Sequence, residues 1–173
     1  HVRQLLRGRQ TIRSEVAAIG DSELDAHLRS EQLLAFMATD PGFVKEMVDV
    51  TSDLALANLQ MMWKEGFRFD GVWMYNDMGY RNASLFSPAM YRQMILPADR
   101  RRNDWCHEHG MQTILHSCGC VKGLIPSLID AGFDCLQPLE VKAGMDLREL
   151  KPLYGDRIAF FGGINTQRLP FAT

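Results

Sequence analysis

The segment at residues 112–123, QTILHSCGCVKG, places an imidazole and two thiols directly after an apolar run. His116 and Cys118 are two residues apart, and side chains with this spacing point to the same side of an extended chain. Both could therefore reach one ion. Neutral imidazole and thiolate are good zinc ligands, and a catalytic zinc takes three protein ligands and keeps one open position. The same spacing also fits a strand end with a backbone-bonded histidine and a small buried cysteine, so both interpretations stay open.

Polar side chains follow three further apolar runs, and we expect all of these run ends to meet at one edge of a parallel sheet, where such folds carry their chemistry. Asp77 and Glu140 are the candidates for catalytic roles, although Asp77 could simply cap a loop and Glu140 could be a surface carboxylate. The candidates for substrate binding are Asn76, Gln137, Gly162, Gly163 and Asn165. Asp146 fits the N-cap of a short helix better than a catalytic site.

The elements that must position these residues alternate between strands and helices. Short apolar runs predict buried strands at 70–75, 111–116, 133–138 and 157–163. Helical spacing and helix start signals predict helices at about 40–66, 87–110, 122–130 and 145–154. Two of these helices begin with a capping residue followed by proline, at Asp40-Pro41 and Ser87-Pro88. Pro97 falls inside the second of them, so we expect a kink or break there.

Alternating strands and helices with short connections indicate right-handed βαβ units and a parallel sheet. No glycine-rich phosphate loop follows any predicted strand, which favours part of an α/β, (β/α)8 TIM-barrel type of fold over a dinucleotide-binding fold. A complete barrel needs about 250 residues, and this chain has 173. We therefore expect a C-terminal half of a barrel with about four parallel strands, forming a single partial domain over 1–173 with a weakly defined lead-in at 1–39. An incomplete barrel of this kind would associate or be poorly soluble alone.

Composition limits the classes of partner. The chain is 46% hydrophobic and 23% charged, with a net charge of −2, which is ordinary for a globular protein and gives no reason to expect nucleic-acid binding. No apolar run reaches the roughly 20 residues that a membrane span requires. Four cysteines in a chain of this length do not suggest a disulfide framework, so we expect a reduced, cytoplasmic setting.

Three segments in order carry a family likeness: YNDMGYRNASLFSPAMYRQMILP, HGMQTILHSCGCVKGLIPSLIDAGFDCLQPLE and MDLRELKPLYGDRIAFFGGIN. Over about residues 40–166 the chain resembles the uroporphyrinogen decarboxylase superfamily. It looks most like the branch that includes cobalamin-dependent methyltransferases acting on thiol coenzymes. The resemblance implies a (β/α)8 barrel with its site in the cleft at the carboxyl ends of the strands.

The resemblance also implies roles for individual residues. His116 and Cys118 match the zinc-binding H-x-C pair of the methyltransferase branch, and Asp77 and Glu140 match rim carboxylates. The third zinc ligand of that branch is a cysteine far downstream, whereas this chain has no cysteine after Cys135. Three alternatives follow: a ligand beyond Thr173, Cys120 as a substitute, or no zinc. Decarboxylases themselves carry an L-D-W segment and a Q-G-N-L-D-P segment at the positions where this chain has LQPLE and FFGGIN. Their arginine-rich N-terminal substrate motif and its key aspartate are not in this chain either.

These observations support three hypotheses of function. The first is a zinc-dependent methyltransferase that moves a methyl group from a corrinoid, carried by a partner protein, to a small thiol substrate. The second is a metal-independent uroporphyrinogen decarboxylase of porphyrin and heme biosynthesis, a lyase in which Asp77 would hold pyrrole N–H groups. The third is a non-catalytic barrel that binds a small molecule or a corrinoid protein. A homodimer is compatible with each of them.

Overall fold

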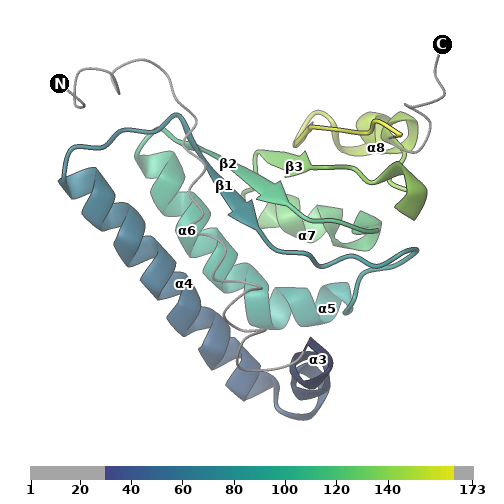
Figure 1. Ribbon diagram of the computed structural model, residues 1–173, viewed down its shortest axis with the longest axis horizontal. Coiled ribbons are helices and arrows are strands. Elements are labelled where there is room, and N and C mark those ends of the chain that lie inside the picture. The colour runs from purple at the N-terminus through teal and green to yellow at the C-terminus, as the bar shows by residue number, and fades with distance from the viewer. Residues whose placement is uncertain (1–29, 166–173) are drawn as a thin grey trace.

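The computed structural model describes residues 30–165 of the chain, and Figure 1 shows their arrangement. Four parallel strands form one sheet in the order β1-β2-β3-β4. These strands are β1 (Gly71–Tyr75), β2 (Gln112–His116), β3 (Cys135–Gln137) and β4 (Ala159–Phe160). The expected parallel α/β sheet of four strands is therefore confirmed. Most of the lead-in segment, residues 1–29, lies outside the described residues, and its last ten residues form helix α3 (Ser30–Thr39).

The helices connect the strands as the alternation predicts. They are α4 (Pro41–Lys64), α5 (Pro88–Met90), α6 (Leu96–Glu108), α7 (Ile125–Asp130) and α8 (Leu147–Tyr154). A π-helical turn, Tyr91–Ile95, joins α5 to α6, and short 3-10 turns at Lys122–Leu124 and Val141–Ala143 precede α7 and α8. Each helix after α3 thus lies between two strands of the sheet, or before the first, as in consecutive βαβ units.

The helix start signals work as expected. The Asp40 carboxylate accepts a hydrogen bond of 3.1 Å from the backbone N–H of Phe43, and Pro41 is the first residue of α4. Ser87 caps α5 in the same way, accepting from the backbone N–H of Met90 at 3.2 Å. Such caps satisfy N–H groups that have no partner within the helix.

The expected break near Pro97 is present as the π-helical turn, which ends immediately before Leu96. Proline has no N–H to donate and its ring crowds the preceding turn, so the regular hydrogen-bond ladder cannot pass through it. The chain accommodates this by widening one turn, and α6 then continues as a regular helix to Glu108.

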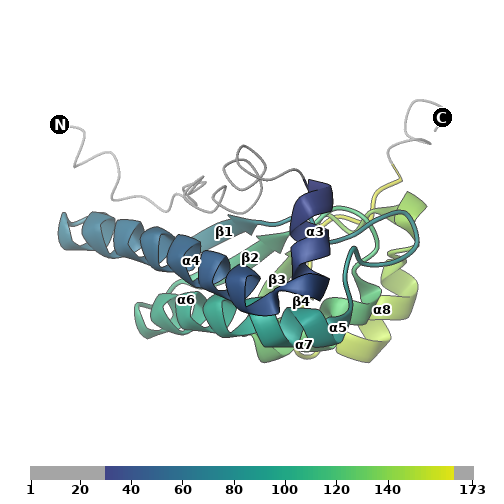
Figure 2. The ribbon, with the colours of Figure 1, turned by 90° about the horizontal axis from the view of Figure 1, so that it is seen from below.

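The helices cover one face of the sheet, as Figure 2 shows for α4, α6 and α7. On that face Met74, Leu115 and Leu136 are at most 3% exposed. The residues that alternate with them, among them Ile114 and Cys135, are only half-buried. The expectation of strands buried on both faces is therefore wrong for the described residues, because their helices all pack from one side. No helix among residues 30–165 is long and apolar enough to cross a membrane.

Candidate metal centre

The loops that follow β1 and β2 lie against each other and are joined by hydrogen bonds. The backbone N–H of Met78 donates to the buried hydroxyl of Ser117 at 3.0 Å, and the backbone N–H of Cys120 donates to the carbonyl of Tyr80 at 2.7 Å. Between these bonds, the backbone N–H of Cys118 donates to Asp77 Oδ1 at 2.6 Å. The carboxylate after the first strand is therefore fixed beside the thiol after the second.

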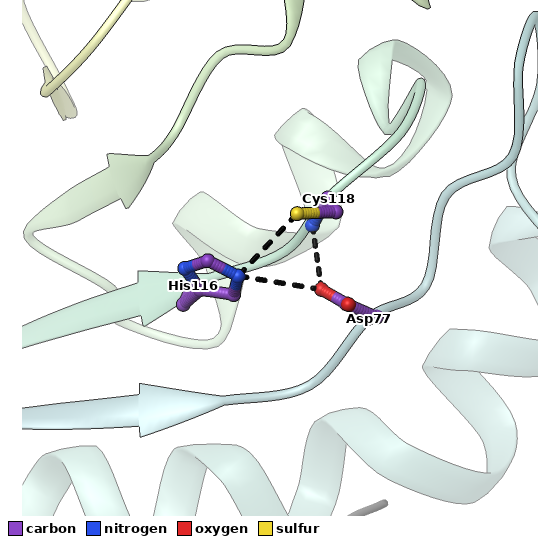
Figure 3. Close-up of side chains that lie close together, drawn as sticks. All are labelled: Asp77, His116 and Cys118. Carbon is purple, nitrogen blue, oxygen red and sulfur yellow. Dashed lines mark hydrogen bonds and ion pairs between the residues drawn. The ribbon is translucent and has the colours of Figure 1, made fainter.

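Asp77, His116 and Cys118 form one cluster of side chains, shown in Figure 3. His116 Nε2 lies 3.4 Å from Cys118 Sγ and 3.6 Å from Asp77 Oδ1. One ligand atom from each residue lies within 4.8 Å of the other two, and within residues 30–165 this is the one group of three or more such residues placed to hold a metal ion. Nitrogen, sulfur and oxygen donors of this kind suit zinc.

The ring of His116 is held in one orientation by two neighbours. Its Nδ1 pairs with Gln137 Oε1, an amide oxygen that can only accept. Nδ1 is therefore the nitrogen that donates to Gln137, and Nε2 is the nitrogen that faces Cys118 and Asp77. Tyr75 stacks on the ring with centroids 4.4 Å apart, and its hydroxyl donates to Asp77 Oδ2 at 3.0 Å. Metal-binding histidines commonly have their second nitrogen fixed in this way.

The electrostatic surroundings of Cys118 favour a cation. Burial raises the pKa of the Cys118 thiol above its usual value, and the nearby carboxylates of Asp77 and Glu140 raise it further. Without a cation the thiol is consequently protonated at neutral pH. A divalent ion among the three side chains would offset both carboxylates and favour the thiolate, since metal binding displaces the thiol proton. The donor set and its charge therefore fit a zinc ion.

Glu140 lies on the same edge of the sheet and holds the loop that carries Cys118. Its Oε2 accepts from the backbone N–H of Gly119 at 2.7 Å, and its Oε1 lies 2.9 Å from Lys142 Nζ. The Lys142 side chain lowers the pKa of the Glu140 carboxyl, and the Gly119 hydrogen bond lowers it as well. Glu140 is thus an ionised anchor for the turn after β2.

The remaining candidates lie at the ends of neighbouring strands. The backbone N–H of Asn76 donates to the carbonyl of His116 at 2.9 Å. Gly163 donates its N–H to the carbonyl of Pro138 at 3.0 Å, and a β-carbon on Gly162 would overlap that carbonyl. Asn165 is half-buried in the segment after β4. The structure therefore brings Asn76 and Gln137 into contact with His116, whereas Gly162 and Gly163 pack on the end of β3.

Sequence reasoning did not single out Tyr75 or give Ser117 a role, although both lie at this site. Tyr75 is the last residue of β1 and pairs with His116 across the sheet. Its position at a strand end, two residues before Asp77, is the sequence feature that could have marked it as a site residue. Ser117 lies between His116 and Cys118 and points the opposite way, into the contact with Met78. Cys120 is buried, its backbone bridges to Tyr80, and it is outside the cluster. Asp146 caps α8, as expected.

Comparison with known proteins gives the family. The family model described as uroporphyrinogen decarboxylase (URO-D) matches residues 26–173, which is most of the chain. The chain belongs to the uroporphyrinogen decarboxylase family. The expected resemblance is therefore confirmed, and the four parallel strands are part of the α/β barrel of this family.

Two curated relatives of this uroporphyrinogen decarboxylase family member are named as methyltransferases. One is the methylcobamide:CoM methyltransferase MtaA of Methanosarcina barkeri, 24% identical over 163 residues, which cover 91% of this chain and 45% of the relative. The other is a methylated-thiol–coenzyme M methyltransferase of Methanosarcina mazei, 28% identical over 105 residues, 61% of this chain and 27% of the relative. The chain spans less than half the length of these relatives.

A solved methyltransferase structure from Methanosarcina mazei has the same fold over the matched part. It superposes with a TM-score of 0.62 at 18% identity, over 79% of this chain and 38% of that one. The likeness confirms the barrel-type fold, and the relatives agree with the methyltransferase-like branch of the family that the sequence resembles.

Proposed function

We propose that this protein is a zinc-dependent methyltransferase that transfers a methyl group from a corrinoid to a small thiol. The observation that carries the proposal is the pairing of His116 Nε2 with Cys118 Sγ at 3.4 Å, at the carboxyl end of β2. The names of the two relatives support it, because one is named for methylcobamide and both are named for coenzyme M. A corrinoid-carrying protein would be the partner that presents the methyl group.

A zinc ion held by His116 and Cys118 would lower the pKa of a bound thiol, so that the thiol reacts as its thiolate. The chain's own residues prepare that site. Gln137 fixes the proton of His116 on Nδ1, which leaves Nε2 to face the metal position. Glu140 and Asp77 hold the backbone N–H groups of Gly119 and Cys118, respectively, and so set the direction of the Cys118 side chain.

The exposure of the cluster suits a bound substrate. The side chain of His116 is 17% exposed and that of Asp77 is 33% exposed. The donor atoms are thus shielded enough to strengthen charge interactions and open enough for a small thiol to reach them. Asn76, Gly162, Gly163 and Asn165 are the residues we assign to the substrate, because they follow β1 and β4 at the same edge of the sheet as the cluster.

Methyl transfer can be measured with free methylcobalamin as donor and 2-mercaptoethanesulfonate, coenzyme M, as acceptor. The zinc-loaded chain should form the S-methyl thioether, detected by mass spectrometry, and His116→Ala should reduce the rate to the uncatalysed level. A zinc-loaded wild-type chain that forms no product above that level would contradict the proposal. Release of carbon dioxide from uroporphyrinogen by the metal-free chain would establish decarboxylation instead, with Asp77 as its carboxylate.

A further inference from the structure

We propose that two copies of this chain pair around a two-fold axis and close one eight-stranded parallel barrel. The chain supplies half of the elements that such a barrel needs, because the four helices α4, α6, α7 and α8 each precede one of the four strands. A (β/α)8 barrel has eight parallel strands inside a ring of eight helices. Two copies therefore supply the full set, and the side chains that would join them are exposed in residues 30–165.

The sheet ends in two open edges. Within residues 30–165, β1 pairs only with β2, and β4 pairs only with β3. Edge strands of this kind are templates for pairing with another chain. Because all the strands are parallel, a two-fold axis along the barrel places β1 of one copy beside β4 of its partner, in the same direction, at two identical junctions. The assembly then closes at two chains and does not grow further.

The face of the sheet that the helices leave open resembles the interior of a barrel. Trp73 and Ile114 are half-buried on this face, and Phe161 is 55% exposed. The rings of Trp73 and Phe161 pack edge-on with centroids 6.1 Å apart, although three strand spacings of about 4.8 Å separate the first strand from the fourth. The sheet therefore curves around this face. Large side chains fill the interior of a closed barrel in the same way.

Helix α4 carries an exposed apolar stripe on the side away from α6. The contact with α6 includes the Ser52 hydroxyl, which donates to the carbonyl of Ala98 at 3.3 Å. Val50, Leu54 and Met61 are 63%, 51% and 57% exposed, and their spacing places them on one face of the helix. At about 3.6 residues per turn, that face lies opposite Ser52. In a ring of helices this is the side that meets a second neighbour.

Helix α8, at the other end of the helix layer in Figure 1, has a matching open flank. Glu149 marks the flank that faces the turn before α7, because its carboxylate lies 2.5 Å from Lys122 Nζ. Leu153 shares that flank, whereas Leu147 lies on the opposite one and is 37% exposed. Leu54 precedes the end of α4 by ten residues and Leu147 precedes the end of α8 by seven, about 15 Å and 11 Å along the two axes. The two leucines therefore meet within one turn when β1 lies beside β4 of the partner.

The exposed apolar surface is large enough for a stable pair. Six large apolar side chains lie along the two junctions: Val50, Leu54, Met61, Leu147, Phe161 and Ile164. With the half-buried side chains of the open sheet face they expose on the order of 800 Å² in each copy, about what each partner buries in a standard interface. All eight strands would end at one mouth, so each copy would form the far wall of the cleft at the other copy's strand ends.

Sedimentation equilibrium of the 173-residue chain tests the stoichiometry without any variant, and it should give a species of two chains and none larger. Leu54→Lys should raise the dissociation constant of this dimer at least about 100-fold, because the interface loses a buried leucine at both junctions. Gln60→Lys is the matched control. Gln60 is exposed on the flank of α4 where Asp53 pairs with Arg101, so its dissociation constant should stay within about twofold of the wild-type value.

A charge exchange tests which surfaces meet. Leu147→Glu alone should weaken the dimer as Leu54→Lys does. An equimolar mixture of the two variants should bind at least about tenfold more tightly than either variant alone. In the mixed dimer one junction is wild type, and the other pairs the new lysine with the new glutamate. Thermal melts of each variant verify that it is folded.

The outcomes that would overturn the proposal are distinct. The first is a wild-type chain that is monomeric at every concentration or that assembles beyond two chains. The second is a mixture of Leu54→Lys with Leu147→Glu that is no tighter than the separate variants. The third is tighter binding of Leu54→Lys to Leu54→Glu than to Leu147→Glu, which would show that α4 pairs with α4 of the partner.

Discussion

Gly79 and Gly119 lie back to back, with no room for a β-carbon at either position. A β-carbon on Gly119 would lie 2.6 Å from the carbonyl oxygen of Gly79, and one on Gly79 would lie 2.6 Å from the carbonyl carbon of Gly119. These glycines immediately follow Met78 and Cys118, which take part in the hydrogen bonds that join the two loops. Their close approach is therefore what brings Asp77 beside Cys118.

Gly119→Ala should lower the free energy of unfolding by about 2–5 kcal/mol, from the combined cost of overpacking and of a left-handed backbone with a side chain. Gly110→Ala is the matched control, because Gly110 has nearly the same φ, +73° against +77°, and open space around it. That control should lose only about 1–2 kcal/mol. Urea denaturation gives both values, and equal losses would show that the contact with Gly79 contributes nothing.

Gln137 should control metal affinity through the ring of His116. Replacing it with leucine removes the acceptor of the Nδ1 proton and should weaken zinc binding by about 10–100-fold. Gln137→Glu keeps an acceptor at that place and should bind zinc at least as tightly as the wild type. Competition with a chromophoric chelator measures both affinities. Wild-type affinity in the leucine variant would contradict the positioning role.

Cys118 should react slowly with iodoacetamide at neutral pH when no metal is bound. Its pKa is raised, first by burial and then by Asp77 and Glu140, so the reactive thiolate is scarcer at pH 7 than for an ordinary thiol. The rate should keep rising beyond pH 9, the usual thiol pKa. Mass mapping distinguishes Cys118 from Cys106, whose pKa burial raises to about 12. A rate that levels off below pH 9 would contradict this environment.

The face of the sheet that no helix of residues 30–165 covers should promote self-association of the 173-residue chain. Phe161, 55% exposed, packs edge-on against Trp73, which lies in the middle of β1. Phe161→Ser should reduce association measured by sedimentation velocity, whereas Leu153→Ser, at a residue of α8 that is 62% exposed, should leave it unchanged. A wild-type chain that is monomeric at every concentration would contradict the prediction.

The elements were predictable where their signals are local. Asp40-Pro41 and Ser87-Pro88 mark helix starts within four residues of chain, and both caps form as expected. Strand ends were less predictable, because they depend on a partner. The segment 157–163 is apolar enough to predict a strand over its whole length. In the structure only Ala159 and Phe160 form β4, where they pair with Cys135 and Leu136 of β3.

The candidate site was predictable in its membership more than in its contacts. Parallel strands place their carboxyl ends together, so the convergence of Asp77, His116 and Gln137 follows from the strand order. The stacking of Tyr75 on His116 does not follow, because it depends on the register of β1 against β2. The approach of Gly79 to Gly119 does not follow either, because it joins two loops 40 residues apart in the chain. Both contacts are determined by the three-dimensional structure and not by local sequence.

The central claim is that His116 and Cys118 hold a metal ion, and zinc analysis of the purified chain tests it most directly. Wild type should contain about one zinc per chain, Cys118→Ala should contain none while keeping its fold, and Cys120→Ala should keep its zinc because Cys120 lies outside the cluster. A metal-free wild-type chain that still catalyses its reaction at full rate would contradict the account.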